Sequence, residues 1–138
     1  MSILYLTCPL ATWVATGALK ALIRYATQGR SAVQDFGAGG MPSNHVAIVS
    51  SVTTVVVRLE GHDSPAAGIA MALLLIVVFD ATSLRRQLGA MAQRLNRLHP
   101  EEAPLRERTG HSWLEVMAGL IWGAVFGLAW SMVPLLFK

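Results

Sequence analysis

Two histidines in this chain have neighbours that would suit chemistry. His111 is followed four residues later by Glu115, the spacing at which two side chains on a helix can touch. His45 ends the run GGMPSNH at residues 39–45, where glycines and a proline lead into a mostly apolar stretch. Such a turn presents backbone N–H groups at the start of a helix, where the helix dipole also attracts anions. The simpler interpretation of the run is a helix cap without chemistry.

Histidines, carboxylates and cations together suit phosphoryl transfer. One histidine can attack phosphorus while a carboxylate holds its other ring nitrogen and fixes the tautomer. A second histidine can protonate the departing alkoxide. Lysine, arginine and backbone N–H groups would hold the phosphate oxygens and offset the charge of the transition state. The chain offers the carboxylates Asp80 and Glu115 and the cations Lys20, Arg24, Arg85 and Arg86.

The composition indicates a membrane protein. Of the 138 residues, 54% are hydrophobic and 14% are charged, whereas soluble domains have about 25% charged residues. The single cysteine cannot form a disulfide within the chain. The net charge of +3 comes from arginines in the polar connections, which suits lipid headgroups better than nucleic acid. We therefore expect membrane lipids as partners and no nucleic acid.

The apolar segments predict an all-α fold, a polytopic membrane helical bundle that forms a single domain over residues 1–138. Four segments would cross or enter the membrane, at about 3–26, 45–59, 65–81 and 112–136. Leucines at helical spacing predict an amphipathic helix at about 83–98, lying on the cytoplasmic face of the membrane. The second segment is short for a full span, so the preceding turn is expected to dip into the membrane.

A row of glycines marks the last segment as a site of close helix packing. Gly119, Gly123 and Gly127 recur every four residues, and rows of small residues let helices approach closely in lipid. Glu115 continues this row toward the start of the segment. We therefore expect Glu115 to face the bundle.

The order of the segments brings the polar residues to one face of the membrane. The first and third connections lie on the same side by parity, and the third carries six arginines between residues 83 and 110. The positive-inside rule places these connections in the cytoplasm and both termini outside, as expected for a bacterial inner-membrane protein. The residues that would meet at this face are Lys20, Arg24, His45, Asp80, His111 and Glu115. Lys20 and Arg24 would bind phosphate there or simply extend to the membrane interface.

Three blocks of the sequence resemble the divergent branch of the PAP2 superfamily, small membrane proteins related to acid phosphatases and vanadium haloperoxidases. The first block is the run at 39–45. The second is Asp80-Ala81 followed by a pair of arginines, and the third is Gly110-His111 followed by Glu115-Val116. Their order and the intervening apolar segments match over nearly the whole chain.

The resemblance implies a role for each matching residue. His111 would be the phosphohistidine nucleophile, Glu115 would orient it and His45 would be the general acid. Asp80 would be a further catalytic residue beside these three. Ser43, with the neighbouring backbone of Gly40 and Asn44, would bind phosphate. Lys20 would match the lysine of the superfamily's first motif, and Arg85 or Arg86 would bind phosphate or support the structure.

The predicted function is a membrane phosphatase that hydrolyses a lipid phosphate or diphosphate, of the polyprenyl or glycerolipid type. No cofactor or metal is expected, although Asp80 and Glu115 could hold Mg²⁺ in a variant of this mechanism. The alternative is a non-catalytic membrane subunit that binds anionic lipid or has a structural role and keeps a degenerate site. Four short helices make a thin bundle, so a homodimer is a candidate assembly.

Overall fold

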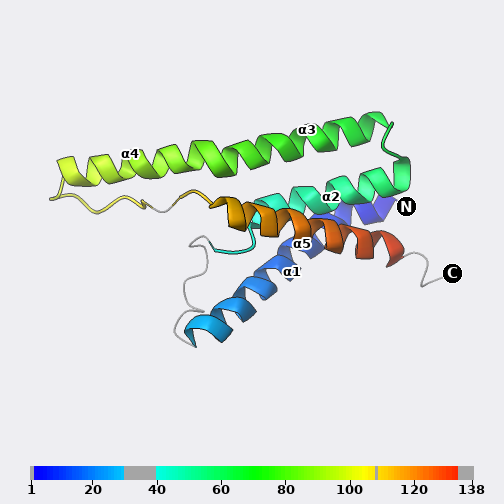
Figure 1. Ribbon diagram of the computed structural model, residues 1–138, viewed down its shortest axis with the longest axis horizontal. Helices are drawn as coiled ribbons and strands as arrows, with labels where there is room; N and C mark the ends of the chain where they lie inside the picture. Colours follow the sequence, from blue (N-terminus) through cyan, green and yellow to red (C-terminus); the bar gives the residue numbers. More distant parts are fainter. Residues whose placement is uncertain (1, 30–39, 108, 134–138) are drawn as a thin grey trace.

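The chain folds into a bundle of helices, and a computed structural model describes residues 2–29, 40–107 and 109–133. The elements are α1 (Ser2–Gln28), α2 (Asn44–Glu60), α3 (Pro65–Phe79), the π-helical turn η2 (Asp80–Leu84), α4 (Arg85–Leu98) and α5 (Trp113–Met132) (Figure 1). No strand occurs in these described residues. The predicted all-α membrane bundle is confirmed. Gly39 and the end of the predicted fourth segment, residues 134–136, lie outside the described residues.

Helix α2 is the centre of the bundle, packed against α1, α3 and α5 (Figure 1). Its closest partner is α5, through the glycine row predicted from the sequence. Each glycine of the row lies against one backbone carbonyl at the start of α2 or within it. The pairs are Gly119 with Ser43, Gly123 with Ala47 and Gly127 with Ser51. A methyl group at Gly123 would overlap the carbonyl of Ala47. We call this contact between α2 and α5 the glycine seam.

Buried hydroxyl groups join α1 to the seam. The hydroxyls of Thr12 and Ser51 lie 2.8 Å apart, and both residues are fully buried. On α5, the indole N–H of Trp122 donates to the hydroxyl of Thr16 at 3.0 Å. Interhelical hydrogen bonds of this kind, together with close packing, hold helices together where lipid removes the hydrophobic drive between them.

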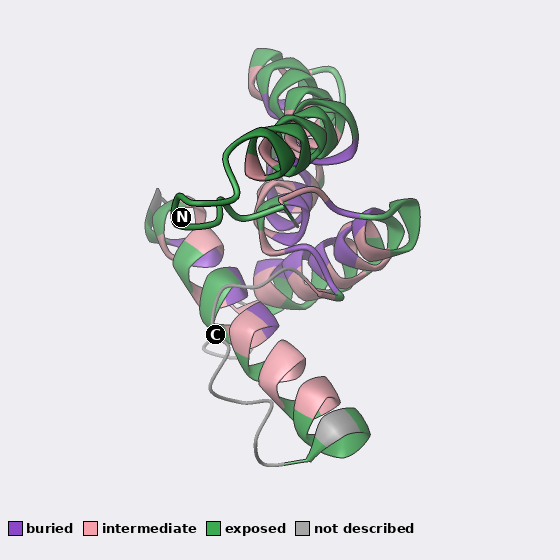
Figure 2. Ribbon diagram, turned by 90° about the vertical axis from the view of Figure 1, so that its left-hand side faces the viewer, coloured by how far each residue is buried: buried purple, intermediate pink, exposed green. Residues whose placement is uncertain are grey.

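Helices α3 and α4 form one continuous rod with η2 between them (Figure 1). The sequence predicts an 83–98 helix that is separate from the third segment, whereas the structure joins the two. The chain has no glycine or proline from Asp80 to Leu84, and the backbone stays helical on both sides of η2. The two helices therefore continue end to end over Pro65–Leu98. Much of the outer surface of this rod is exposed (Figure 2).

The segment after α4 runs back along the rod, and we call its residues 99–107 and 109–112 the strap (Figure 1). The side-chain amide of Asn96 clasps the backbone of Leu105, donating to its carbonyl at 2.9 Å and accepting from its N–H at 2.8 Å. Gly89 leaves room for the strap, because a Cβ there would overlap the carbonyl of Glu107. These contacts return the chain to the start of α5.

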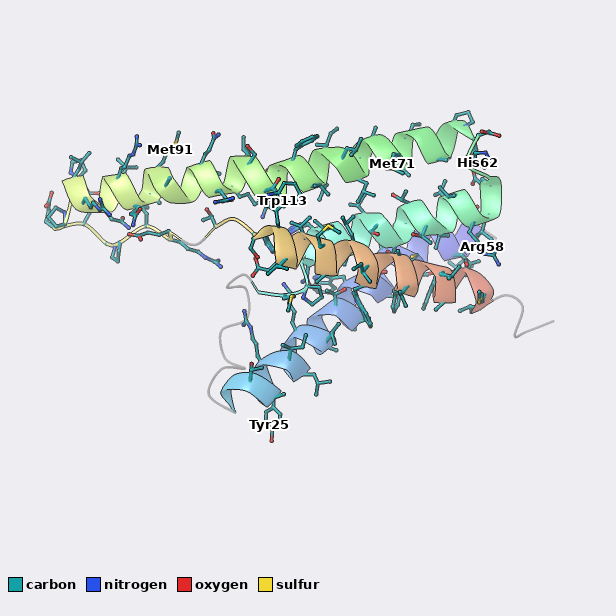
Figure 3. The ribbon with its side chains drawn as sticks, in the orientation of Figure 1. Tyr25, Arg58, His62, Met71, Met91 and Trp113 are labelled. Atoms are coloured by element: carbon teal, nitrogen blue, oxygen red, sulfur yellow. The ribbon has the colours of Figure 1, made fainter. Side chains whose placement is uncertain are left out.

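Three helical stretches in the described residues are long and apolar enough to cross a membrane: Ile3–Thr27, Pro65–Leu98 and Trp113–Met132. Helix α2 has 17 residues, or about 26 Å at the usual rise, against about 30 Å for a hydrocarbon core. The start of α1 and the end of α5 lie at one end of the bundle, with Arg58 and His62 (Figures 1 and 3). Trp113 begins α5 at the other end (Figure 3). The candidate site lies at that second end.

Candidate functional site

The start of α2 is an uncapped helix N-terminus. Ser43 occupies the N-cap position with extended backbone angles, yet its side chain makes no capping hydrogen bond. In contrast, Ser64 and Ser112 both cap their helices by accepting from the backbone N–H three residues on. The hydroxyl of Ser43 is fully buried, and neither it nor Oδ1 of Asn44 has a partner among the described residues. The first N–H groups of a helix have no partner within it, and unpaired donors of this kind attract anions.

The turn before α2 is fixed by α5 and by α1. The N–H of Ser43 donates to the carbonyl of Glu115 at 3.0 Å, and Gly119 packs against the same serine. Gly40 has a φ of +99°, which a side chain would strain, and a Cβ there would lie 3.3 Å from Nη2 of Arg24. Arg24 of α1 therefore lies against the turn that begins α2.

His111 is held at the end of the strap, with 9% of its surface exposed. Its N–H donates to the carbonyl of Ala81 in η2 at 3.1 Å. Burial lowers the pKa of His111 below its ordinary 6.5; the negative charge of Glu115 opposes this shift, and the positive charge of Lys20 adds to it. The neutral form of the His111 imidazole is therefore favoured. Its Nδ1 is buried and has no partner among the described residues.

The carboxylate of Glu115 does not hold the ring of His111 in the way the resemblance implies. Its Oε2 accepts instead from the N–H of Ser112 at 2.8 Å, while the Ser112 hydroxyl accepts from the N–H of Glu115. This reciprocal capping box stabilises the start of α5. The sequence contains the capping-box pattern, because Ser112 and Glu115 have the required spacing of three. Glu115 still acts on His111 through its charge.

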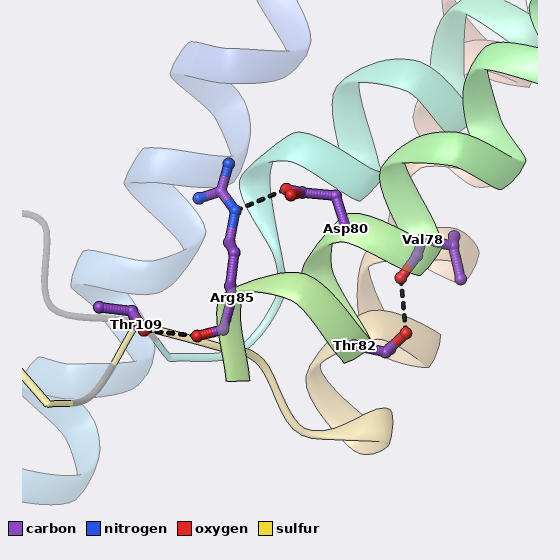
Figure 4. A network of polar contacts seen from close by, with 5 residues as sticks. All are labelled: Val78, Asp80, Thr82, Arg85 and Thr109. Atoms are coloured by element: carbon purple, nitrogen blue, oxygen red, sulfur yellow. Dashed lines mark hydrogen bonds and ion pairs between the residues drawn. The ribbon is translucent and has the colours of Figure 1, made fainter. Parts of the chain in front are cut away.

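Asp80 and Arg85 form an ion pair across η2, with Nε of Arg85 2.6 Å from Oδ2 of Asp80 (Figure 4). The carbonyl of Arg85 accepts from the hydroxyl of Thr109 in the strap at 2.6 Å. The charge of Arg85 acts on both His45 and His111. Arg86 is exposed, and its Cγ and backbone pack against Gly110 of the strap.

The structure thus brings most of the predicted site residues together and leaves Arg86 on the outer surface. Electrostatic interactions link Lys20 with Arg24 and Glu115, and link His45 with Lys20, Asp80 and Arg85. His111 interacts in the same way with Lys20, His45, Arg85 and Glu115. The groups that meet at this end are Lys20, Arg24, Ser43, His45, Asp80, Arg85, His111 and Glu115.

The sequence analysis missed three groups that position the site. The Thr109 hydroxyl and the Ala81 carbonyl tie the strap to the rod, and Ser112 holds Glu115. Of the three, only Ser112 belongs to a recognisable sequence pattern, the capping box with Glu115. Among the residues that the structure describes, no group of three or more His, Cys, Asp or Glu side chains is arranged to hold a metal. The carboxylates of Asp80 and Glu115 instead have Arg85 and Ser112 as partners.

Chemically, this end combines an uncapped helix N-terminus with a buried histidine and several cations. An anion at the start of α2 would meet the Ser43 hydroxyl and backbone N–H groups. Lys20 and Arg85 would offset its charge, because both interact electrostatically with the histidines. The arrangement suits a phosphate or a similar oxyanion.

Comparison with known proteins identifies the family of the chain. A family model described as the Divergent PAP2 family matches residues 2–126. An uncharacterized membrane protein of Bacillus subtilis (strain 168), YuiD, is 30% identical over 109 residues, which is 65% of this chain and 69% of the Bacillus protein. No solved structure matches the chain. With three helical stretches apolar enough to cross a bilayer and a family match over most of its length, this chain is a membrane protein that belongs to the Divergent PAP2 family.

Proposed function

We propose that this protein is a membrane phosphatase that hydrolyses a lipid phosphate or diphosphate, of the polyprenyl or glycerolipid type, through a phosphohistidine. The observation that carries the proposal is the uncapped start of α2. A helix terminus with a buried, unpartnered serine hydroxyl is costly unless an anion completes it. His111, which is buried and whose neutral form is favoured, shares this end of the bundle.

In the first step, a ring nitrogen of His111 attacks phosphorus. The N–P bond forms as the ester P–O bond breaks. His45 in its imidazolium form, which the charge of Asp80 favours, gives its proton to the departing oxygen and becomes neutral. The Ser43 hydroxyl, the N–H groups at the start of α2 and Lys20 hold the phosphate oxygens. Water then attacks phosphorus, His45 takes a proton from it, and the P–N bond breaks to release phosphate.

We propose that the site faces the cytoplasm of a bacterial cell, in the inner membrane, with both termini outside. The six arginines between residues 83 and 110 support this orientation through the positive-inside rule. The lipid tail would stay in the bilayer while the headgroup reaches the polar end of the bundle. No metal is needed for this route, since His111 supplies the nucleophile. Activity that is abolished by a chelator would instead favour Mg²⁺ held by Asp80 and Glu115.

The test is release of labelled phosphate from polyprenyl and glycerolipid phosphates and diphosphates by the purified protein. We expect the wild type to release phosphate and to carry an acid-labile phosphoryl label, and we expect His111→Ala to do neither. His62→Ala is the matched control, because His62 lies in the turn between α2 and α3 at the opposite end (Figure 3). Equal activity of wild type and His111→Ala, or no activity in either, contradicts the proposal.

A second candidate is a non-catalytic subunit that binds anionic lipid at the same site. It is favoured by the Glu115 carboxylate, which caps α5 instead of orienting His111. Under this function, the wild type would retain anionic lipid during purification without turning it over. His45→Ala would then reduce the retained lipid and leave phosphate release at background.

A further inference from the structure

The two arginines that follow Asp80-Ala81 do not play the same part. We infer that Arg85 binds the phosphoryl group of the substrate, and that Asp80 is a positioning residue that directs the Arg85 guanidinium through the π turn η2. This inference rests on the proposed function and deepens it. It assigns Asp80 a role through Arg85 rather than a role as a catalytic acid or base.

The π turn is what allows Asp80 and Arg85 to meet. In an ordinary α-helix, residues five apart point in directions about 140° from each other. In η2 the N–H of Arg85 bonds to the carbonyl of Asp80, five residues back, and the two side chains pair as well, at 2.6 Å. Single π turns inside α-helices occur frequently at functional sites. In an α-helix this spacing would separate the two side chains, whereas in the π turn they lie close enough to form an ion pair.

The contact with Asp80 uses only one edge of the guanidinium. Nε faces the carboxylate, while both Nη atoms point away from Asp80 (Figure 4). The Nη groups carry four of the five N–H donors of an arginine, which suit the oxygens of a phosphate. The side chains of Arg85 and Asp80 are 36% and 33% exposed, respectively, so the pair is accessible to a ligand and only partly screened by water.

Arg85 is also the arginine that is tied to the two histidines. Its charge acts on His45 and on His111, and the Thr109 hydroxyl joins its carbonyl to the strap that carries His111. Arg86 is exposed, and its Cγ and backbone pack against Gly110. Arg85 is therefore held at two points: its guanidinium bonds to Asp80, and its backbone carbonyl accepts from Thr109.

The experiment compares Arg85→Ala, Asp80→Asn and the matched control Arg86→Ala in the full-length protein. Phosphate release should fall about 10²–10³-fold in Arg85→Ala, the range for loss of one preorganised donor. It should fall about 10–100-fold in Asp80→Asn, which removes one charge-assisted hydrogen bond, and little in Arg86→Ala. Added guanidinium ion should restore activity to Arg85→Ala. It should fail to do so in Arg85→Ala combined with Asp80→Ala, because no carboxylate remains to hold the ion.

A second measurement separates this inference from the proposed function. Binding of inorganic phosphate, followed by calorimetry, should weaken in Arg85→Ala and recover with guanidinium only when Asp80 is present. That pattern supports the inference even if no lipid is hydrolysed. If the wild type is active and both Arg85→Ala and Asp80→Asn match it, the inference is overturned while the phosphatase stands. A wild type that neither binds phosphate nor releases it overturns both.

Discussion

The glycine seam and the α3–α4 rod position their halves of the site in different ways. In the seam, glycines of α5 let its backbone touch α2, and the contact fixes Ser43 at the start of that helix. The rod is largely exposed, and it joins the bundle through Ala81, which packs with Val46 and Val116, and through polar contacts such as the one from Thr109 to Arg85. Backbone-to-backbone packing therefore places Ser43, whereas side-chain packing and hydrogen bonds together place Arg85. The strap carries His111 between the two.

The largest effect is expected from filling the seam. Gly123→Val should overlap the carbonyl of Ala47 and the Cβ of Ser50 and force the two helices apart. Overpacking of this kind costs about 1–3 kcal/mol, or more where backbone must move. Thermal unfolding in detergent measures the loss. Gly68→Val is the matched control, because a Cβ at Gly68 in α3 meets nothing within 4 Å. Equal stability of the two variants would mean that the seam is not the rigid half.

Two serines at helix starts should respond differently to the loss of their hydroxyl groups. Ser112→Ala should lose about 1 kcal/mol, because its hydroxyl caps α5. Ser43→Ala should lose little or no stability, since its buried hydroxyl has no partner among the described residues. Its binding of inorganic phosphate should nevertheless weaken. Unfolding curves and phosphate titrations on both variants check this pair, and a loss of stability in Ser43→Ala would assign that serine to the packing instead.

A smaller effect is expected from loosening the strap. Thr109→Val removes the donor to the Arg85 carbonyl and should cost about 0.5–1.5 kcal/mol. Amide hydrogen exchange at His111, whose N–H bonds to the Ala81 carbonyl, should become faster. Thr27→Val is the control, because that exposed hydroxyl bonds only within its own helix. Unchanged exchange at His111 would show that the strap does not depend on this tie.

The smallest effect is a shift of the acidic limb of the kcat/KM profile, which reports the pKa of His111 in the free protein. Burial lowers this pKa, so the wild-type limb should lie below pH 6.5. Glu115→Gln removes a charge that raises the pKa, so the limb should move to lower pH, and glutamine can keep the capping box. Lys20→Met removes a charge that lowers the pKa, so the limb should move to higher pH. Shifts in the same direction would contradict this account.

The same lowered pKa affects stability. The unfolded chain binds a proton at its ordinary histidine pKa, whereas folded His111 binds it only at lower pH. The contribution of His111 to stability is therefore complete above about pH 6.5 and is lost as pH falls through the folded pKa. Unfolding measured from pH 7.5 down to 5 should show a decline that is reduced in His111→Ala.

Hydrophobic patterning was enough to predict the helices and the polar end where they meet. Apolar runs of membrane length define helices in any lipid-embedded chain, and parity then fixes which helix ends share a side. The glycine row likewise predicted close approach in α5, although its partner α2 had no matching signal beyond small residues such as Ala47 and Ser50. Pairing of helices depends on long-range packing, which local patterns do not contain.

The finer geometry of the site could not be predicted in this way. In a π turn each backbone hydrogen bond spans five residues, whereas in an α-helix it spans four. Nothing in the sequence Asp80–Leu84 breaks a helix or signals this change. The path of the strap depends on Gly89 and Asn96, which lie in a helix predicted to rest on the membrane. Glu115 had two eligible partners, His111 and Ser112, and the local capping geometry favoured Ser112.

The start of α1 and the end of α5 lie at the end of the bundle away from the strap (Figure 1). Reporter proteins fused before α1 and after α5 should therefore signal from the same compartment. A protease supplied from that compartment in sealed vesicles should spare the strap, and one supplied from the other side should cut it at its exposed stretch, residues 101–107. Which compartment is the cytoplasm then follows from a single fluorescence reading on intact cells.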